Sequence, residues 1–407
     1  MDQEAWASRI RQQMVFEADR SEPPADFPVL PSIPTERYVS SEFYALEQAV
    51  WRRSWLMVGR LEDFEEPGRY RVIDRGASPL LICRDLEGVL RAFFNTCQHR
   101  GAPVVRDATG VVKRFRCQYH SWTYGLDGQL LAVPDARDFG DLDWSTRGLR
   151  PLRIEVYGGW IFVNEDLEAE PLLDWLGPIA KEWAPLKGET LRAIETRRER
   201  IPANWKIVAD AFLETYHLKT IHMATVAKLL DHRGAAMGLF RNGHSRMVTP
   251  KWEKALRKQL EADSPLPEIP GLHPLFAETN PAYSVFPNLI TPIDTVGFPF
   301  IQFWPLGVEE TEIEWTFYGP PPETADQQAA WRGYVGVFDV VMNEDFQNLK
   351  PMHRSVASGA LASIPLNYQE RRIYHLHEEI DRRIGPDQIP EEMRIEPILE
   401  PFWETAG

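Results

Sequence analysis

The pattern of apolar and polar positions divides the chain into a β-rich part and a mixed part. Between about Trp55 and Val163, short apolar or alternating runs are separated by turn residues such as Pro67-Gly68 and Gly158-Gly159. Such runs predict the strands of a small antiparallel β-domain. Before this domain, residues 1–35 predict a helix and a proline-rich arm, and Ser40-Ser41-Glu42 predicts the start of a further short helix.

The second part mixes helical and strand-like segments. Helices are predicted at Leu172–Leu186, Trp205–Met223 and Ala325–Asn348, and strands at Ala282–Val285, Phe298–Trp304 and Thr311–Tyr318. The predicted fold class is therefore α+β, with a small antiparallel β-domain and a larger domain whose antiparallel sheet is flanked by helices. We expect an N-terminal arm and helix over residues 1–54, packed on the larger domain, the β-domain over 55–165, and the larger domain over 166–407. The weakly periodic stretch Ala224–Asn280 is interpreted as a lid or a variable insertion.

Composition limits the classes of protein that fit. The 407 residues exceed one typical core, so two domains are expected. The net charge of −15 argues against nucleic acid as a partner. No run of eighteen apolar residues and no signal-peptide pattern is found, so we expect a soluble, cytoplasmic protein without a membrane contact. Three cysteines exclude a disulfide framework, and Cys83 is expected to be a buried, inert thiol.

Two short motifs carry metal-binding chemistry. Cys97-Gln-His99 and Cys117-Gln-Tyr-His120 each supply one thiolate and one imidazole. Together they match a [2Fe–2S] centre in which two His replace two Cys on one iron. The alternative is a structural zinc site, but zinc motifs usually group Cys with Cys and His with His. Trp122 and Tyr124 follow the second motif, and they either cover the cluster or pack as ordinary core residues.

A second site is indicated by Glu214, His217 and His222. Glu214 and His217 are three residues apart and share a face of the predicted helix. His222 lies five residues beyond His217, so both imidazoles reach one ion only if the helix is distorted or ends between them. The alternative is that both are ordinary surface or core histidines.

Both sites together resemble those of the Rieske non-haem iron, or aromatic ring-hydroxylating, oxygenases, and the chain resembles their catalytic α subunit. Cys97-Gln-His99-Arg-Gly101 and Cys117-Gln-Tyr-His120-Ser-Trp122-Thr-Tyr124 match the cluster domain, and Asn204-Trp205-Lys206 precedes the second motif as in that family. The resemblance implies that His217, His222 and a carboxylate of a C-terminal helix hold a mononuclear Fe(II). In Asn343-Glu344-Asp345 we assign Asp345, with Glu344 and Asp339 as alternatives.

The resemblance also implies roles for two further acids. Glu214 takes the place of a bridging carboxylate, usually Asp, that joins an iron-ligand His to a cluster His of the neighbouring subunit, here His120 or else His99. Ala211 stands where many members have Asn, so Asp210, one turn before Glu214, is expected to substitute in part. Its alternative is an acid on the helix surface.

The resemblance implies one Rieske cluster and one mononuclear Fe(II) per chain, used to activate O₂. The chain has no G-x-G-x-x-G fingerprint, so NAD(P)H and flavin are expected only on a separate reductase, with or without a ferredoxin. Cross-subunit electron transfer implies a head-to-tail homotrimer. A rival hypothesis, an electron-transfer or regulatory Rieske protein that has lost its iron, is disfavoured because all three iron ligands are present.

The substrate is inferred from the segment Pro281–Gly307, which is rich in aromatic residues and has Asp294 as its one acid. The family builds its pocket from this sheet, so hydroxylation or dihydroxylation of an apolar or aromatic small molecule is expected. The alternative is a monooxygenase or demethylase acting on a quaternary ammonium compound, held by aromatic rings and a carboxylate. The candidate pocket residues are Asp294, Phe303, Trp304 and Trp315, although part of this aromatic set must be strand core.

Overall fold

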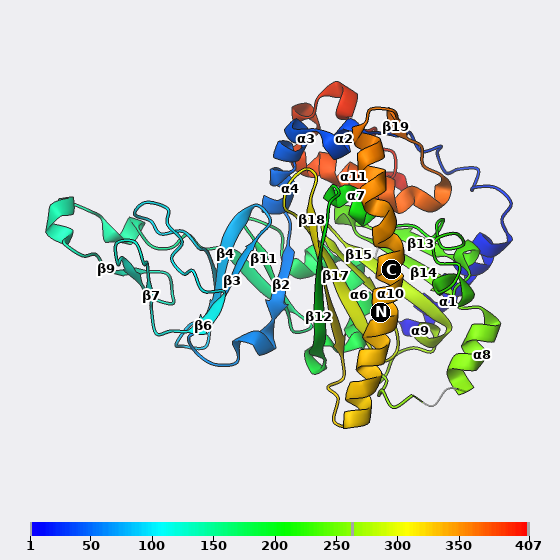
Figure 1. Ribbon diagram of the computed structural model, residues 1–407, viewed down its shortest axis with the longest axis horizontal. Coiled ribbons are helices and arrows are strands. Elements are labelled where there is room, and N and C mark those ends of the chain that lie inside the picture. The colour runs from blue at the N-terminus through cyan, green and yellow to red at the C-terminus, as the bar shows by residue number, and fades with distance from the viewer. Residues whose placement is uncertain (1, 262–263, 405–407) are drawn as a thin grey trace. The chain divides into compact units, whose positions relative to one another are not determined.

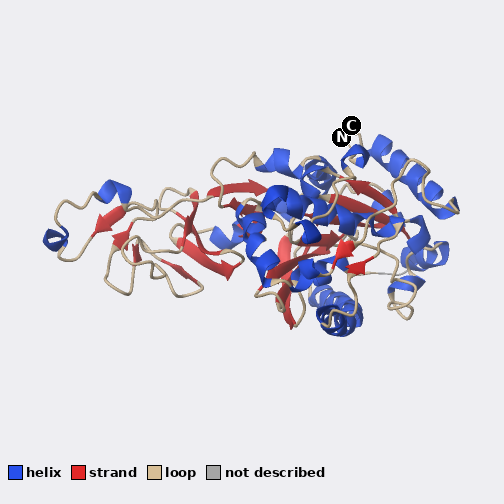
Figure 2. Ribbon diagram, turned by 90° about the horizontal axis from the view of Figure 1, so that it is seen from above, coloured by secondary structure: helices blue, strands red, loops and turns tan. Residues whose placement is uncertain are grey.

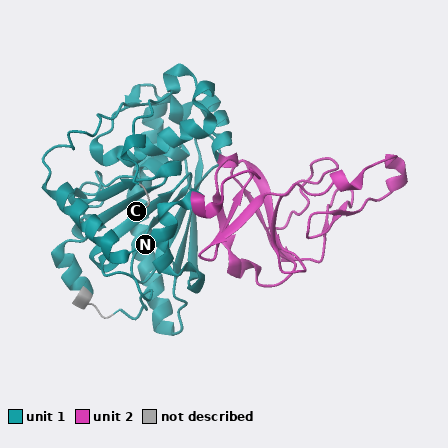
Figure 3. Cartoon of the chain, turned by 180° about the vertical axis from the view of Figure 1, so that it is seen from behind, with its two compact units in different colours: residues 1–50, 175–407 teal, residues 51–174 magenta. Residues whose placement is uncertain are grey.

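The computed structural model describes residues 2–261 and 264–404, and the chain forms two compact units (Figure 3). The smaller unit comprises residues 51–174. The larger comprises residues 1–50 together with 175–407. The boundaries predicted from the sequence, 54/55 and 165/166, differ from those of the two units by four and nine residues. Within the described residues, no helix is both long and apolar enough to cross a membrane.

The smaller unit is built from antiparallel sheets, which confirms the predicted β-domain. Its sheets have the strand orders β10-β11-β2, β5-β4-β3-β6 and β7-β8-β9. The strands are β2 (Leu56–Arg60), β3 (Arg69–Arg75), β4 (Ser78–Arg84), β5 (Leu90–Phe94), β6 (Thr109–Val111), β7 (Phe115–Arg116), β8 (Thr123–Tyr124), β9 (Leu130–Ala132), β10 (Arg153–Tyr157) and β11 (Trp160–Asn164). The first Cys/His motif lies in the loop after β5 and the second joins β7 to β8. Cys83 is buried on β4.

The larger unit contains a seven-stranded antiparallel sheet in the order β12-β18-β17-β16-β15-β14-β13 (Figure 1). Its strands are β12 (Arg192–Ile201), β13 (Ala236–Leu239), β14 (Ser245–Pro250), β15 (Thr279–Val285), β16 (Leu289–Pro292), β17 (Phe298–Pro305) and β18 (Thr311–Gly319). A separate two-stranded sheet pairs β1 (Ile33–Pro34) with β19 (Ser363–Ile364). The predicted α+β class is thereby confirmed.

Helices cover both faces of this sheet (Figure 2). On one face, Trp183 of α6 packs on Phe300 of β17, with ring centroids 5.4 Å apart. On the other face, Phe338 of α10 packs on Phe317 of β18 at 5.3 Å. The helices of the larger unit are α1 (Gln3–Asp19), α2 (Glu36–Val39), α3 (Ser41–Leu46), α4 (Gln48–Arg52, which ends in the smaller unit), α5 (Leu172–Leu176, which begins there), α6 (Pro178–Trp183), α7 (Trp205–Asp210), α8 (Glu253–Glu261), α9 (Leu275–Glu278), α10 (Ala325–Ala357) and α11 (Arg371–Ile384).

The predicted helix Trp205–Met223 is wrong beyond Asp210, where α7 ends. The N–H groups of Phe212 and Leu213 donate to carbonyls only three residues back, those of Ala209 and Asp210. The N–H of His217 then donates to the Glu214 carboxylate at 3.1 Å. The helix thus ends at Asp210, where the hydrogen bonds tighten to three residues, and at His217 a side chain takes the place of the backbone acceptor that a resumed helix would use.

The interpretation of Ala224–Asn280 as a lid or a variable insertion is also wrong for residues 236–250. The segment supplies β13 and β14 to the large sheet, and β14 pairs with β15 over six residue pairs. All but the last residue of β14 are buried. Because a strand buried on both faces shows no apolar–polar alternation, its sequence lacks the pattern that marks a strand.

Candidate functional site

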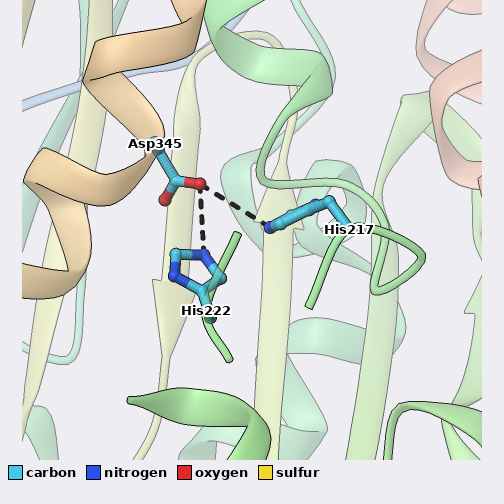
Figure 4. Close-up of side chains that lie close together, drawn as sticks. All are labelled: His217, His222 and Asp345. Carbon is cyan, nitrogen blue, oxygen red and sulfur yellow. Dashed lines mark ion pairs between the residues drawn. The ribbon is translucent and has the colours of Figure 1, made fainter. Parts of the chain in front are cut away.

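Three side chains of the larger unit converge on one point (Figure 4). One ligand atom from each of His217, His222 and Asp345 can be chosen so that all three lie within 4.8 Å of one another. Nε2 of His222 lies 3.1 Å from Oδ1 of Asp345, and Nε2 of His217 lies 3.6 Å from the same oxygen. The structure therefore brings together the three residues assigned to the mononuclear iron. The helix break after Asp210 lets both imidazoles face Asp345 on α10.

Each imidazole is held through its other nitrogen by a carboxylate. Nδ1 of His217 contacts Glu214, and Nδ1 of His222 lies 2.7 Å from Oε2 of Glu344. A carboxylate at Nδ1 fixes the tautomer that carries its proton there and leaves Nε2 free to bind a metal. Two imidazoles and one carboxylate are the donor set of Fe(II) sites that keep open positions, so these residues fit the iron that the sequence implied.

The two alternative iron ligands on α10 have other partners. Glu344 accepts hydrogen bonds from His222 and from the hydroxyl of Thr225, the latter at 2.6 Å. Burial opposes ionisation of Glu344, but these two hydrogen bonds hold its pKa below the ordinary value. Asp339 accepts from the indole of Trp315 and pairs with Arg197 at 3.3 Å. Asp339 is therefore occupied away from the two imidazoles.

Asp210 is not the helix-surface acid of the alternative interpretation. The hydroxyl of buried Tyr38 donates to Asp210 at 2.8 Å, and Nε2 of His377 lies 3.0 Å from the same hydroxyl. Nε of Arg37 donates to Nδ1 of His377, which places the His377 proton on Nε2 and directs the chain of hydrogen bonds toward Asp210. Burial raises the pKa of Asp210 to about 7, although the Tyr38 hydrogen bond and the charge of Lys206 oppose this.

We expect Asp210→Asn to raise thermal stability more at pH 8 than at pH 5. The native pKa of about 7 exceeds the value near 3.9 of an unfolded aspartate. Native wild-type protein thus binds this proton more tightly, and its stability falls as pH rises from about 4 to about 7. Asparagine does not titrate, so the gain in free energy of unfolding should be larger at pH 8 by roughly 2 kcal/mol. Melting curves at the two pH values, with exposed Asp387→Asn as control, measure it; equal gains for both variants would contradict the raised pKa.

The four predicted cluster ligands lie together in the smaller unit. Cys97 and Cys117 are buried, and the rings of His99 and His120 are 4.6 Å apart. Nδ1 of His99 is buried and has no hydrogen-bond partner among the described residues. A buried imidazole nitrogen without a partner is expected at a metal ligand, because an unpaired polar atom is otherwise costly to bury. The residues therefore fit a Rieske cluster.

Trp122 and Tyr124 both pack in the core and contact the ligands. The ring of Trp122 stacks on His99, with centroids 5.0 Å apart and planes 7° apart. The hydroxyl of Tyr124 lies 3.3 Å from Sγ of Cys97 and accepts the N–H of Gln98 at 3.0 Å. Trp122 and Tyr124 are therefore core residues that also cover the candidate cluster ligands. With a thiolate ligand at Cys97, the Tyr124 hydroxyl becomes its hydrogen-bond donor.

We expect Tyr124→Phe to lower the reduction potential of the cluster by some tens of millivolts. A hydrogen bond to a ligand sulfur stabilises the electron-rich reduced state, so its loss favours the oxidised state. For a one-electron couple, 59 mV corresponds to about 1.4 kcal/mol, the size of one hydrogen bond to a charged group. Redox titration followed by EPR measures the change. Tyr70→Phe, in the same core, is the control, and an equal shift in both variants would exclude a specific effect of the Tyr124 hydroxyl.

A cavity of about 540 Å³ opens beside the iron residues. One wall is a stripe of α10 that includes Tyr334, Phe338, Met342 and Asp345, at helical spacing. The opposite wall is the sheet face formed by alternate residues of β14 to β17. Most of the lining is apolar, and Asp294 lines the cavity as predicted.

The other three predicted pocket residues do not line the cavity. Trp304 points to the sheet face opposite that of the lining residue Ile301, because residues an odd number apart on a strand face opposite ways. Phe303 shares the face of Ile301 but packs against Phe212. Trp315 is covered by α10, where it contacts Phe346 and donates to Asp339. These aromatic residues belong to the strand core.

Lys251, Tyr334 and Thr225 are functional candidates that the sequence did not reveal. Lys251 and Tyr334 line the cavity near Asp294, and Thr225 holds Glu344. Lys251 continues the alternation of Met247 and Thr249 from β14, so recognising that strand would have placed it on the cavity face. No local signal marks Tyr334 or Thr225, because their roles depend on contacts far apart in the sequence.

Comparison with known proteins matches both units. Residues 183–386 match the family "Ring hydroxylating alpha subunit (catalytic domain)", and residues 54–153 match the "Rieske [2Fe-2S] domain". A glycine betaine monooxygenase oxygenase subunit from Chromohalobacter salexigens is 30% identical over 49% of this chain and 45% of its own length. A chlorobenzene dioxygenase subunit alpha from a Cupriavidus species is 33% identical over 45% of this chain and 42% of its own length. The chain thus matches somewhat less than half the length of these two relatives.

A solved structure extends the likeness along the chain. The crystal structure of the quaternary ammonium Rieske monooxygenase CntA with L-carnitine has a TM-score of 0.72. It is 22% identical in sequence and covers 90% of this chain and 100% of its own. At that identity the likeness shows a shared fold.

Proposed function

Because the chain belongs to the family of ring-hydroxylating oxygenase alpha subunits and carries a Rieske domain, we propose that it is the terminal component of an oxygenase that oxidises a small quaternary ammonium compound. The family implies one Rieske cluster and one mononuclear iron per chain, and both sets of ligand residues fit them. The observation that carries the oxygenase activity is the convergence of His217, His222 and Asp345 beside a mostly apolar cavity.

The bound groups would supply electrons, through the cluster, and O₂ activation, at the iron. The residues of the chain position and isolate this chemistry. Glu214 and Glu344 orient the two imidazoles, and the apolar walls limit the access of water to the reacting end of the substrate. We further propose that Glu214 joins His217 to a cluster histidine of a neighbouring subunit, in a homotrimer supplied by a separate reductase, with or without a ferredoxin.

The charge at the iron end supports a cationic substrate. Glu214 and Asp345 line the cavity and Glu344 stands behind His222. Three carboxylates exceed the charge of one divalent iron by one, so a cation is favoured beside them. The similarity to a glycine betaine monooxygenase supports the same class. Monooxygenation with loss of a methyl group is then the proposed reaction.

An apolar aromatic substrate is the second candidate. The lining is mostly apolar, and the chlorobenzene dioxygenase relative is as similar as the betaine enzyme over a comparable length. The two candidates differ in whether the substrate places a charge at the iron end.

Metal analysis and turnover assays test this proposal. About three irons and two sulfides per chain, with a rhombic EPR signal after reduction, are expected for the two sites. With a surrogate reductase, trimethylammonium compounds should drive O₂ consumption coupled to formaldehyde release. Coupled oxidation of uncharged aromatic compounds alone would support the second candidate, and zinc without sulfide would contradict both.

A further inference from the structure

We propose that the cavity takes an elongated substrate whose far end, remote from the oxidised group, carries an oxygen acceptor that binds the ammonium group of Lys251. This inference rests on the proposed function, which places the oxidised end at His217, His222 and Asp345, and it names the class of substrate more closely. It is carried by a belt of polar residues at the other end of the cavity, which we call the polar belt: Thr249, Lys251, Asn280, Asp294 and Tyr334.

The strand register places three members of the polar belt, Thr249, Asn280 and Asp294, in one row across the sheet, and Tyr334 reaches Asp294 from α10. Thr249 of β14 pairs with Asn280 of β15. Asn280 lies beside Asp294, because Ala282 pairs with Pro292, two residues along on each strand. Lys251 follows Thr249 on the same face. The next row holds Met247, Ala282, Pro292 and Pro299, which are all apolar.

The polar belt is far from the iron residues. On α10, Tyr334 precedes Asp345 by eleven residues, which is about 16 Å along a helix. The register of the sheet places Ile290 of β16 near the iron end. Ile290 pairs with Ile301, and Ile301 pairs with Trp315. Trp315 packs against Phe346, the residue after Asp345. From Ile290 to Asp294 is about 13 Å along a strand. Two elements on opposite walls therefore give similar separations, about 16 Å and about 13 Å.

Lys251 has hydrogen-bonding capacity left over. Its side chain is only 9% exposed, and its Nζ donates to Gln259 at 2.9 Å. Asp294 lies 3.8 Å away, which is beyond hydrogen-bond distance. Among the described residues no other hydrogen-bond partner of this ammonium is found, whereas an ammonium group carries three donors. A buried donor without an acceptor is costly, so an oxygen of the substrate would relieve it.

The acid of the polar belt is already satisfied. Asp294 accepts the backbone N–H of Thr295 at 2.7 Å and the hydroxyl of Tyr334. Its charge also balances that of Lys251. A carbonyl oxygen therefore suits the polar belt better than a carboxylate, which would meet the carboxylate of Asp294. The span of about 13 to 16 Å between the two ends of the cavity calls for an extended chain between the oxidised carbon and this oxygen.

The test uses the full-length, iron-loaded holoenzyme and a series of trimethylammonium compounds with alkyl chains of increasing length. Each length is made with a carboxamide, a carboxylate or a methyl group at its far end. Dissociation constants from calorimetry and KM values are measured for the wild type, Lys251→Met, Lys251→Met/Asp294→Asn and, as control, Lys254→Met on the exposed side of the same segment. The double variant removes the unpaired carboxylate that the single variant leaves.

We expect the long carboxamide to bind wild type roughly tenfold more tightly than the methyl-ended compound of equal length. This ratio should fall to near one in both Lys251 variants and persist in Lys254→Met. Oxidation of the ammonium compounds with no dependence on end group or on Lys251 would overturn this inference and leave the proposed function standing. Binding that depends on Lys251 without any oxidation would contradict the proposed function and leave the role of Lys251 in binding standing. A carboxylate preferred over the carboxamide would contradict the charge argument at Asp294.

Discussion

His217→Ala is expected to abolish turnover and mononuclear iron while the cluster keeps its visible spectrum. Nε2 of His217 is one of three ligand atoms that converge at the site, and alanine leaves only His222 and Asp345. Loss of an outer partner of a metal ligand already costs roughly 10–100-fold in affinity or activity, so loss of a ligand should cost more than about 100-fold. The cluster residues lie in the other unit, so their absorption should not change.

Iron and sulfide analysis, together with coupled O₂ consumption, measures the effect. We expect about two irons and two sulfides per chain in place of three irons and two sulfides. His232→Ala is the matched control, because this nearby histidine holds Thr215 through a backbone carbonyl that the substitution leaves in place. Simultaneous loss of the cluster spectrum in His217→Ala would contradict two independent metal sites.

The grouping of the candidate cluster ligands could be predicted from the sequence because each pair is local. Cys97 and His99 are two residues apart and Cys117 and His120 are three apart, so short loops alone bring each pair together. The candidate iron ligands could not be placed from local spacing alone. His217 and His222 meet because α7 ends at Asp210 and the chain continues in turns, in one of which Glu214 accepts the N–H of His217. Helical periodicity does not reveal where the helix ends.

The pocket was the least predictable part, for two physical reasons. Successive residues of a strand face opposite sides of the sheet, so Phe303 and Trp304 lie on different faces. The sequence does not show which of these faces forms the cavity. Which alternate residues of β17 face the cavity is known only once α10 is placed on one side of the sheet. Lys251 was missed because β14 is buried on both sides and therefore resembles no amphipathic strand.

Glu214→Gln is expected to retain both metals and to slow electron transfer from cluster to iron by roughly 10–100-fold. Glutamine keeps the size of the side chain and can accept one hydrogen bond from His217, but it loses the negative charge beside that imidazole. In the proposed bridge, this charge also stabilises the cluster imidazole of the neighbouring subunit as an electron passes. The measurement is single-turnover oxidation of the reduced cluster in the presence of O₂ and substrate, followed by absorbance. Metal content, measured on the same samples, distinguishes slower electron transfer from loss of bound iron.

The site contains its own matched control for this prediction. Glu344 holds Nδ1 of His222 as Glu214 holds Nδ1 of His217, so Glu344→Gln removes the same charge at the same kind of contact. If both acids only orient their imidazoles, the two variants should weaken iron binding to the same extent and should have the same rate of cluster oxidation. If Glu214 also joins a cluster histidine of the next subunit, only Glu214→Gln should slow cluster oxidation at full iron occupancy. Equal rates in the two variants would remove the bridging role and leave Glu214 as a positioning residue.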